Sequence, residues 1–275
     1  MRRVEFTTEQ LEDIFNKYQN EHLSLKKIGE IYGVSRTVIT RVFKEHEVEI
    51  TGNDHKYQAD YRKFETIDSA EKAYWLGFIA ADGCVYKRTG NATIRIAIHE
   101  KDIDHLEKLK LFMNSNVNIK TFINDTGYSK NSPTPMCAIC FNSVKMAEDL
   151  ITLGVVPNKS LVLKAPNIDE KFYLPYILGY FDGDGTIFKF NHDKEFTVGF
   201  TGSKDTISWI NQVLNLNATI EQRVVGSQTY YIRCGGIDKP YNILKSLYDS
   251  ANVHLDRKFQ LFKELENVVL NRNIK

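Results

Sequence analysis

Two short segments of this sequence end in the same acidic pattern, which could hold a metal ion. Residues 75–83 read WLGFIAADG and residues 177–185 read ILGYFDGDG, so Asp82 and Asp184 stand at the same place in each segment. Each aspartate would close an apolar helix, where the helix dipole disfavours an anion. If the two ends meet, like charges add to that cost, and a divalent cation with oxygen ligands such as Mg²⁺ removes it. One Asp-Gly pair is an ordinary helix-ending turn, but two at matched positions favour a metal site.

The residues before each aspartate predict two helices that lie against each other. Gly77 and Ala81 are four residues apart and share one helix face, as do Gly179 and Gly183 in the second segment. Small residues at this spacing let two helix backbones approach closely. The other positions are apolar on nearly all sides, so both helices should be buried. We expect the helix pair to be the seam between two halves, and with a bound metal this arrangement suits hydrolysis of one phosphodiester bond per strand of a duplex.

The same order of elements follows each segment. Apolar spacing predicts helix–strand–strand–helix–strand–strand–helix twice, in residues 67–165 and again in residues 166–275. Each copy ends in a tail with one lysine, Lys159 or Lys258, at nearly the same distance from its aspartate. The predicted fold class is therefore α+β, with two pseudo-symmetric αββαββα halves produced by internal duplication.

Residues 1–48 predict a small all-α domain ahead of the two halves. Three short helices are expected, and the third is a serine-capped helix that follows a glycine turn, which is the helix-turn-helix signature. The outer face of the third helix would then enter the major groove of DNA. The residues on that face are Arg36, Thr37, Thr40, Arg41 and Lys44. A three-helix interaction module is the alternative. Residues 49–66 are polar without a sustained apolar period and would form a linker.

Strand alternation indicates further residues that could face DNA. In residues 92–99 the isoleucines point inward, so Thr93, Arg95 and His99 point away. Residues 218–225 predict a strand with Ile220 and Val224 on one face and Arg223 on the other. The candidate contacts to base edges or phosphates are Thr93, Arg95, Arg223, Tyr231 and Arg233. A merely solvated sheet face is the alternative for each of them.

The composition limits the class of protein. The chain has 275 residues, of which 42% are hydrophobic, so a well-formed core is expected. The formal charge of +1 neither suggests nor excludes a nucleic-acid partner, because the local distribution decides. We find neither a signal peptide nor an apolar run near 18 residues, and expect no membrane association and an intracellular location with the DNA. Cys137 and Cys140 form one CxxC, which we interpret as inert strand thiols rather than a zinc or redox site.

The two acidic segments resemble the two LAGLIDADG motifs of single-chain homing endonucleases. The resemblance covers about residues 65–270 and includes the motif, the duplicated order of elements and the tail lysine. In that family the last aspartate of each motif binds the metal at the active centre, which carries over to Asp82 and Asp184. The implied metal set also includes Gly83 and Gly185, with Mg²⁺ or Mn²⁺ as the ion. Each half's antiparallel sheet forms part of a saddle on the major groove.

The resemblance also bears on the basic residues. Family members place basic or polar side chains near the metals to position water and stabilise charge, which makes Lys159 and Lys258 candidate catalytic residues. A contact to the DNA backbone, or plain exposure, is the alternative for both lysines. The sequence departs from the motif at Ala80, where the first aspartate would stand, whereas Asp182 keeps that aspartate in the second copy. We expect activity to survive this loss, with some asymmetry between the halves.

The implied activity is that of a site-specific, metal-dependent DNA endonuclease. It would act as a monomer on double-stranded DNA with a long asymmetric target site, cut both strands and leave short 3′ overhangs. One alternative on the same fold is a non-cleaving, DNA-binding transcriptional regulator, which the retained Asp82 and Asp184 disfavour. Another is an intron RNA-splicing maturase, whose partner would be intron RNA.

Overall fold

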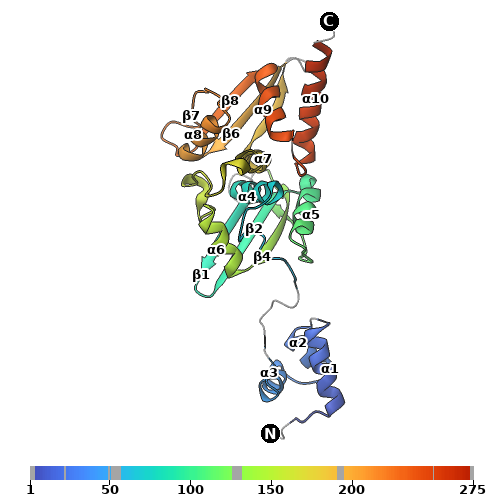
Figure 1. Ribbon diagram of the computed structural model, residues 1–275. Coiled ribbons are helices and arrows are strands. Elements are labelled where there is room, and N and C mark those ends of the chain that lie inside the picture. Colours follow the sequence, from blue (N-terminus) through green and yellow to red (C-terminus); the bar gives the residue numbers. More distant parts are fainter. Residues whose placement is uncertain are drawn as a thin grey trace. The chain divides into compact units, whose positions relative to one another are not determined.

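The computed structural model describes residues 4–21, 23–48, 50, 57–125, 132–190, 195–249 and 251–272 (Figure 1). The chain forms two compact units, which we describe separately. The N-terminal unit comprises Met1–Ala59 with Asn114–Val117, and the main unit comprises Asp60–Met113 with Asn118–Lys275. Part of the predicted linker, residues 49 and 51–56, lies outside the described residues. The predicted division of the main unit between residues 165 and 166 stays a prediction.

Three helices form the described part of the N-terminal unit: α1 (Thr8–Gln19), α2 (Leu25–Ile31) and α3 (Arg36–Glu45). Hydroxyl side chains cap the first two helices, since Thr7 Oγ1 accepts from Gln10 N and Ser24 Oγ accepts from Lys27 N. Gly33 makes the turn between α2 and α3 with a φ of +64°, which glycine adopts without steric cost. The apolar faces share one core, formed by Ile14, Tyr18, Leu25, Ile28, Ile39 and Phe43.

The main unit is α+β and contains two antiparallel four-stranded sheets, as predicted (Figure 1). The strand order is β1-β2-β4-β3 in the first sheet and β5-β6-β8-β7 in the second. The elements of the first half are α4 (Ala70–Asp82), β1 (Gly83–Arg88), β2 (Asn91–His99), α5 (Ile103–Phe112), β3 (Lys120–Asn124), β4 (Thr134–Asn142) and α6 (Val144–Thr152). Those of the second are α7 (Tyr173–Asp184), β5 (Thr186–Phe190), β6 (Glu195–Gly202), α8 (Lys204–Val213), β7 (Glu221–Gln222), β8 (Tyr230–Gly236), α9 (Asp238–Tyr248) and α10 (Asp256–Arg272).

Each sheet packs one face on helices and leaves the other face open. In β2 the side chains of Ile94, Ile96 and Ile98 are buried, while Thr93 and Arg95 lie on the opposite face, as the alternation predicted. In β8, Ile232 and Cys234 are buried and Tyr231 and Arg233 share the open face. None of the helices that the structure describes has both the length and the hydropathy needed to span a bilayer.

Helices α4 and α7 lie side by side between the two sheets, and their backbones touch (Figure 1). A Cβ at Gly77 would lie 2.0 Å from Tyr176 O, and a Cβ at Gly179 would lie 1.9 Å from Tyr74 O. Near the C-terminal ends of both helices, a Cβ at Gly183 would lie 2.3 Å from the Ala81 Cβ. These distances are far below a van der Waals contact, so the small residues at this interface are required by the packing, as the spacing predicted.

One predicted strand is wrong. Residues 218–225 were expected to form it, but β7 covers only Glu221–Gln222, and Val224 and Val225 are 66% and 96% exposed. The predicted common face of Ile220 and Val224 therefore does not exist. The chain reverses at Gly226, whose φ is +81°, and this turn prevails over the apolar pattern.

Helix α10 was missed by the sequence analysis, which expected only a lysine-bearing tail. Its buried residues are Lys258, Phe262 and Leu265, at helical spacing. The helix lies beyond the element order shared by the two halves, so the repeat gives no sign of it.

The contact between α4 and α7 predicts a large cost for one added methyl group. Gly77→Ala should lower the free energy of unfolding by about 2 kcal/mol or more, because its Cβ has only backbone atoms of α7 to displace. Urea unfolding measures this. The matched control is Gly235→Ala, whose Cβ would meet only the Thr197 hydroxyl at 3.5 Å and Phe196 O at 4.0 Å. Equal stability of the two variants would contradict the described interface.

Candidate metal centre

Asp82 and Asp184 are the last residues of α4 and α7, so the helix pair brings their carboxylates to one place. A Cβ on Gly183, the residue before Asp184, would lie 3.1 Å from Asp82 Oδ2. Asp82 is half-buried and Asp184 is open to solvent. Among the described residues, neither carboxylate accepts a hydrogen bond or forms an ion pair. The two carboxylates therefore lie close together, as predicted, and no described residue donates a hydrogen bond to either of them.

The electrostatics of the pair fit a cation site. Burial, together with the charge of Asp184, raises the pKa of Asp82 to about 7, although Lys258 and Lys159 act in the opposite direction. The pKa of Asp184 is raised as well: its side chain reaches solvent, but the surrounding helix ends still keep part of the water away from the carboxylate, and the same two lysines act in the opposite direction. Within the described residues, no group of three or more histidine, cysteine, aspartate or glutamate side chains is arranged so that it could hold a metal ion by itself. Two carboxylates fit Mg²⁺, which keeps several waters and shares its remaining positions with substrate phosphates.

The glycines that follow the aspartates form the C-caps of the two helices. Gly83 begins β1, and Gly185 directly precedes β5. The carbonyl oxygen of Gly185 accepts a hydrogen bond of 2.6 Å from Lys258 Nζ. The predicted metal role of Gly83 and Gly185 stays a prediction. The carbonyl oxygen of Gly185 is already engaged by Lys258.

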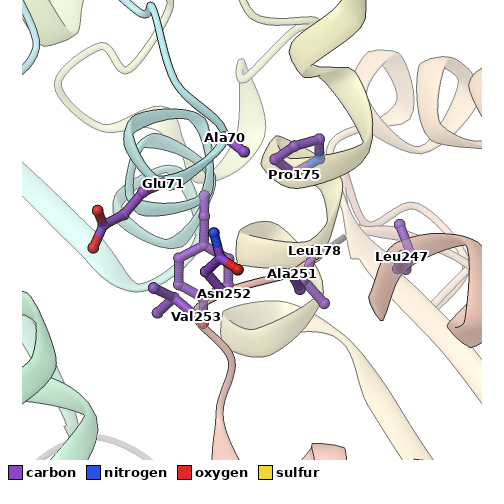
Figure 2. Close-up of a pocket in the computed structure, with 9 residues that line it drawn as sticks. Ala70, Glu71, Pro175, Leu178, Leu247, Ala251, Asn252 and Val253 are labelled. Carbon is purple, nitrogen blue, oxygen red and sulfur yellow. The ribbon is translucent and has the colours of Figure 1, made fainter. Parts of the chain in front are cut away.

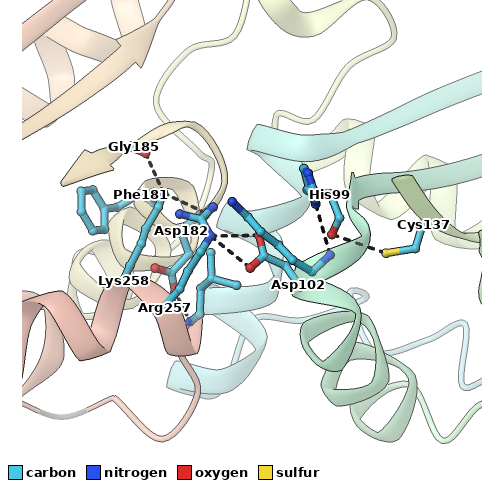
Figure 3. A network of polar contacts seen from close by, with 10 residues as sticks. His99, Asp102, Cys137, Phe181, Asp182, Gly185, Arg257 and Lys258 are labelled. Carbon is cyan, nitrogen blue, oxygen red and sulfur yellow. Dashed lines mark hydrogen bonds and ion pairs between the residues drawn. The ribbon is translucent and has the colours of Figure 1, made fainter. Parts of the chain in front are cut away.

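The two tail lysines are buried at the helix ends, but they are bound differently. Lys159, in a 3₁₀ turn at Lys159–Leu161, donates to Ala81 O at 2.7 Å. Lys258 donates to Phe181 O, Asp182 O and Gly185 O at 2.5, 3.0 and 2.6 Å (Figure 3). A lysine has three N–H donors, so those of Lys258 are all used by backbone carbonyls. A cation at this position also offsets the negative end of the helix dipole.

Burial sets the protonation of both lysines. It lowers the pKa of Lys258 to about 8, with Asp182, Asp82 and Asp184 acting in the opposite direction. It also lowers the pKa of Lys159, against Asp184 and Asp82. Near neutral pH, Lys258 therefore still carries its proton and the positive charge that its three carbonyls and the nearby carboxylates stabilise.

Asp182 has a structural role that the site prediction did not include. It is 1% exposed and accepts from Tyr74 Oη at 2.6 Å, from Leu255 N at 2.8 Å and from Tyr248 Oη at 3.4 Å. Burial raises its pKa to about 6, while Lys258 and these donors act in the opposite direction. The bond to Leu255 fastens the chain three residues before Lys258. In the first half Ala80 stands at the matching position, so this buried carboxylate with its hydrogen bonds exists only in the second half.

A neutral histidine completes this buried network. Tyr74 Oη lies 3.0 Å from His105 Nε2, and since the tyrosine proton goes to Asp182, the histidine donates through Nε2. Burial lowers the pKa of His105 to about 3, so it carries no charge at neutral pH. Its Nδ1, which is the unprotonated acceptor nitrogen in this tautomer, has no partner within the described part of the chain.

A cavity of about 230 Å³ lies beside Asp82, and its lining includes His99, Asp102 and Arg257. Arg257 Nε donates to both oxygens of Asp102, at 3.0 and 2.9 Å (Figure 3). Arg257 also helps to lower the pKa of Asp82. Sequence reasoning missed this pair because its members are 155 residues apart.

A second hollow lies between α4, α7 and the chain before α10 (Figure 2). It is about 20 Å³, room for roughly one water molecule. Its lining is mostly apolar and contains none of the predicted site residues.

One row on each open sheet face carries an arginine, and the two rows lie at matching places. Cys84, Arg95 and Cys140 pair across β1, β2 and β4, and Thr186, Gly199 and Arg233 pair across β5, β6 and β8. Both rows begin two residues after the aspartate. The guanidinium of Arg95 lies 5.1 Å from the Phe122 ring centre, and that of Arg233 lies 4.7 Å from the Tyr231 ring centre. Both arginines therefore have an aromatic support, which favours a fixed position.

The other predicted DNA contacts are distributed over both units. In the main unit, Thr93 Oγ1 donates to Asn142 Oδ1, Tyr231 Oη donates to Glu221 Oε2, and Arg223 is exposed. On α3, Arg36, Thr37 and Lys44 are exposed. The other two are engaged within the N-terminal unit: Thr40 Oγ1 donates to Arg36 O, and Arg41 Nη2 donates to Val4 O.

No disulfide joins the four cysteines within the described residues. All four thiols are free. Cys137 is buried, which raises the pKa of its thiol to about 11, and Cys140 lies on the other face of β4. The CxxC lies in strand β4, as interpreted, and the inertness of its thiols stays a prediction.

Comparison with known proteins identifies part of the main unit. Residues 69–154, from the start of α4 to just beyond α6, match the family described as LAGLIDADG-like domain. No curated protein matches the chain. The fold is shared with a lysine-to-alanine mutant of I-SmaMI, at a TM-score of 0.50 and 13% identity, over 73% of this chain and 92% of that one. The resemblance is thus confirmed for the first half and for the fold.

Two further solved structures are similar at lower scores. The I-LtrWI LAGLIDADG homing endonuclease bound to target DNA has 13% identity over 74% of this chain and 92% of its own, with a TM-score of 0.48. Full-length DUF199/WhiA from Thermatoga maritima has 17% identity over 78% of this chain and 65% of its own, with a TM-score of 0.47.

The raised pKa of Asp82 predicts that removing its charge stabilises the metal-free protein. Its folded pKa of about 7 exceeds the ordinary value of 3.8, so ionising it costs stability as the pH rises from 3.8 to 7, and the cost is constant above. Asp82→Asn should therefore be more stable than the wild type by about 2–4 kcal/mol at pH 8, and equal to it near pH 4. Urea unfolding in EDTA measures this.

The control for this prediction is Asp104→Asn, an exposed aspartate of α5. It should show no gain at pH 8. A gain at Asp82 of the same size at both pH values would show that the amide relieves a steric rather than an electrostatic cost, and would contradict the prediction.

Proposed function

We propose that the protein is a site-specific DNA endonuclease that hydrolyses one phosphodiester bond in each strand of a duplex. The observation that carries this proposal is the pair Asp82 and Asp184, brought together by the contact of α4 and α7 and left without hydrogen-bond donors among the described residues. A purely structural buried carboxylate would be hydrogen-bonded, as Asp182 is. Two carboxylates that repel each other and can be reached from solvent are suited to binding a cation.

The metal in this proposal is Mg²⁺ or Mn²⁺, held by Asp82 and Asp184 with the carbonyl groups of Gly83 and Gly185 close by. When bound, such an ion activates a water molecule and stabilises the leaving oxygen. The chain itself supplies the geometry, because the helix contact fixes the spacing of the two carboxylates. Since both come from one chain, a monomer is sufficient.

The two lysines are assigned different roles. Lys159 donates one N–H to Ala81 O and makes no further hydrogen bond among the described residues, so two N–H groups can turn to a phosphate oxygen. Lys258 has no such donor left, and we assign it to positioning the end of α7. The resulting asymmetry, with Ala80 on one side and Asp182 on the other, predicts unequal rates for the two strands.

Double-stranded DNA is the proposed partner, in contact with the two open sheet faces. Arg95 and Arg233 are suited to phosphates beside the cut positions, because their rows begin two residues after each aspartate. The two sides differ in their other residues, among them Thr93 and Tyr231 on the faces and Arg223 in the hairpin beyond β7, so the preferred target is long and asymmetric. The exposed residues of α3 (Arg36, Thr37 and Lys44) are suited to a further groove contact in a helix-turn-helix mode. Such a protein works inside the cell, with the DNA.

The proposal predicts metal-dependent cutting that needs both aspartates. Duplexes are first selected from a randomised library by binding to the wild type, then incubated with Mg²⁺ or with EDTA. We expect double-strand cuts with Mg²⁺ only, and Asp82→Asn and Asp184→Asn should each slow them at least about a hundredfold, in line with the loss of a metal's charge stabilisation. Asp104→Asn, which is exposed on α5, should cut like the wild type.

The contrary results are distinct. Specific binding without any cut would contradict the endonuclease and leave a DNA-binding protein on this fold. Cutting that persists in both aspartate variants would place the chemistry elsewhere. Selection of no duplex at all would remove DNA as the partner, and intron RNA would then be the next ligand to test.

A further inference from the structure

The hairpin between β7 and β8 ends in an exposed apolar tip. Val225 is 96% exposed and Val224 is 66% exposed, whereas Val85, Val155 and Val198 of the same unit are buried. Single exposed apolar residues are common on protein surfaces. Two adjacent exposed valines at the end of a hairpin form a small apolar surface that a partner can contact.

The backbone at this tip forms a tight turn. Ser227 N donates to Val224 O at 2.9 Å, and Gly226 has a φ of +81°. This is the pattern of a type II turn, with Val225 at its second position and Gly226 at its third. Glycine, proline, asparagine, aspartate and serine dominate such turns, so valine is not required by the turn itself. The turn itself therefore does not explain the two valines.

The tip is held in one conformation by its own hydrogen bonds. Gln222 Nε2 donates to Ser227 O at 3.0 Å and to Tyr230 Oη at 3.2 Å. Arg223 N donates to Thr229 O at 2.9 Å, and Ser227 Oγ donates to the same oxygen at 3.1 Å. A surface ordered in advance loses little entropy on binding. The turn therefore presents its two valines ready for contact.

Cationic groups lie at the tip and along the strands that lead to it. Arg223 is exposed directly beside Val224, and Arg233 lies on the open face of the adjacent strand. Lys204 Nζ lies 5.9 Å from the centre of the Tyr230 ring. The nearby Glu221 accepts a hydrogen bond from Tyr231 Oη. This combination suits a partner that carries negative charge on its outside and an apolar group within reach.

Duplex DNA meets both conditions. The phosphates are negative, and the C5-methyl of thymine is an apolar group displayed in the major groove, where valine-sized side chains can contact it. A two-stranded ribbon also fits the width of that groove. A membrane surface or an apolar protein partner would fit the valines but would not explain the continuity of the tip with the open, arginine-bearing sheet face.

We propose that Val224 and Val225 contact thymine C5-methyl groups in the major groove and so select thymine at one or two neighbouring positions of the target. This inference rests on the proposed DNA-binding function. It adds a readout of base identity that does not depend on hydrogen bonding.

The test replaces thymine by uracil, which lacks only the methyl group, one position at a time in a duplex selected from a randomised library. Binding is measured with the full chain in EDTA, so that no cutting interferes. For the wild type we expect uracil to weaken binding about fourfold per lost methyl contact, at one or two adjacent positions only. In Val225→Ala, or in the double variant with Val224→Ala, the same positions should become insensitive to uracil.

The matched control is Leu111→Ala, an apolar residue of α5 that is 75% exposed and lies on a helix packed against the covered side of the first sheet. It should keep the wild-type uracil profile. A flat profile for the wild type, or the wild-type profile in Val225→Ala, would overturn the inference while leaving specific DNA binding intact. If the valine variants lose binding affinity equally on every duplex, the valines act in folding or bind another partner. That result would also overturn the inference. Selection of no duplex would overturn the proposed function and the inference with it.

Discussion

The direct backbone contact between α4 and α7 is the constraint on which the rest of the main unit depends. It requires glycine at Gly77 and Gly179, where a Cβ would lie about 2 Å from a carbonyl oxygen of the other helix. Because the helices touch along their length, their C-terminal ends also meet, and the last residues of both are aspartates. The position of the candidate metal centre follows from this packing.

The meeting of two helix ends with two carboxylates has an electrostatic cost, and the structure offsets it with buried cations. Lys159 and Lys258 bind the terminal carbonyls of α4 and α7 and lower the pKa of Asp82 by their charge. The offset is incomplete, since the pKa of Asp82 remains near 7. In the proposed metal centre, a bound cation would remove the remaining cost. Asp182 is the opposite case, a buried carboxylate with its own donors that fastens the chain leading to Lys258.

The sequence predicted those features that depend on local spacing. The small residues of the two helices, the isoleucine alternation of β2 and the order of strands are all local patterns, and the structure confirms them. The features it could not predict join distant residues: the bond from Tyr74 to Asp182 spans 108 positions, and the pair Arg257–Asp102 spans 155. The short β7 was mispredicted for another reason, because Val224 and Val225 have a strand-like pattern but lie at a turn set by Gly226.

The central claim is that Asp82 and Asp184 hold one metal centre between them. Electron paramagnetic resonance of free Mn²⁺ measures this directly, with the wild type, each aspartate-to-asparagine variant and the double variant. A shared centre predicts that each single variant loses most of the Mn²⁺ affinity and that the double variant loses little more. Losses that simply add would show two independent sites, and unchanged binding in both single variants would show a metal bound elsewhere; either result would contradict the account.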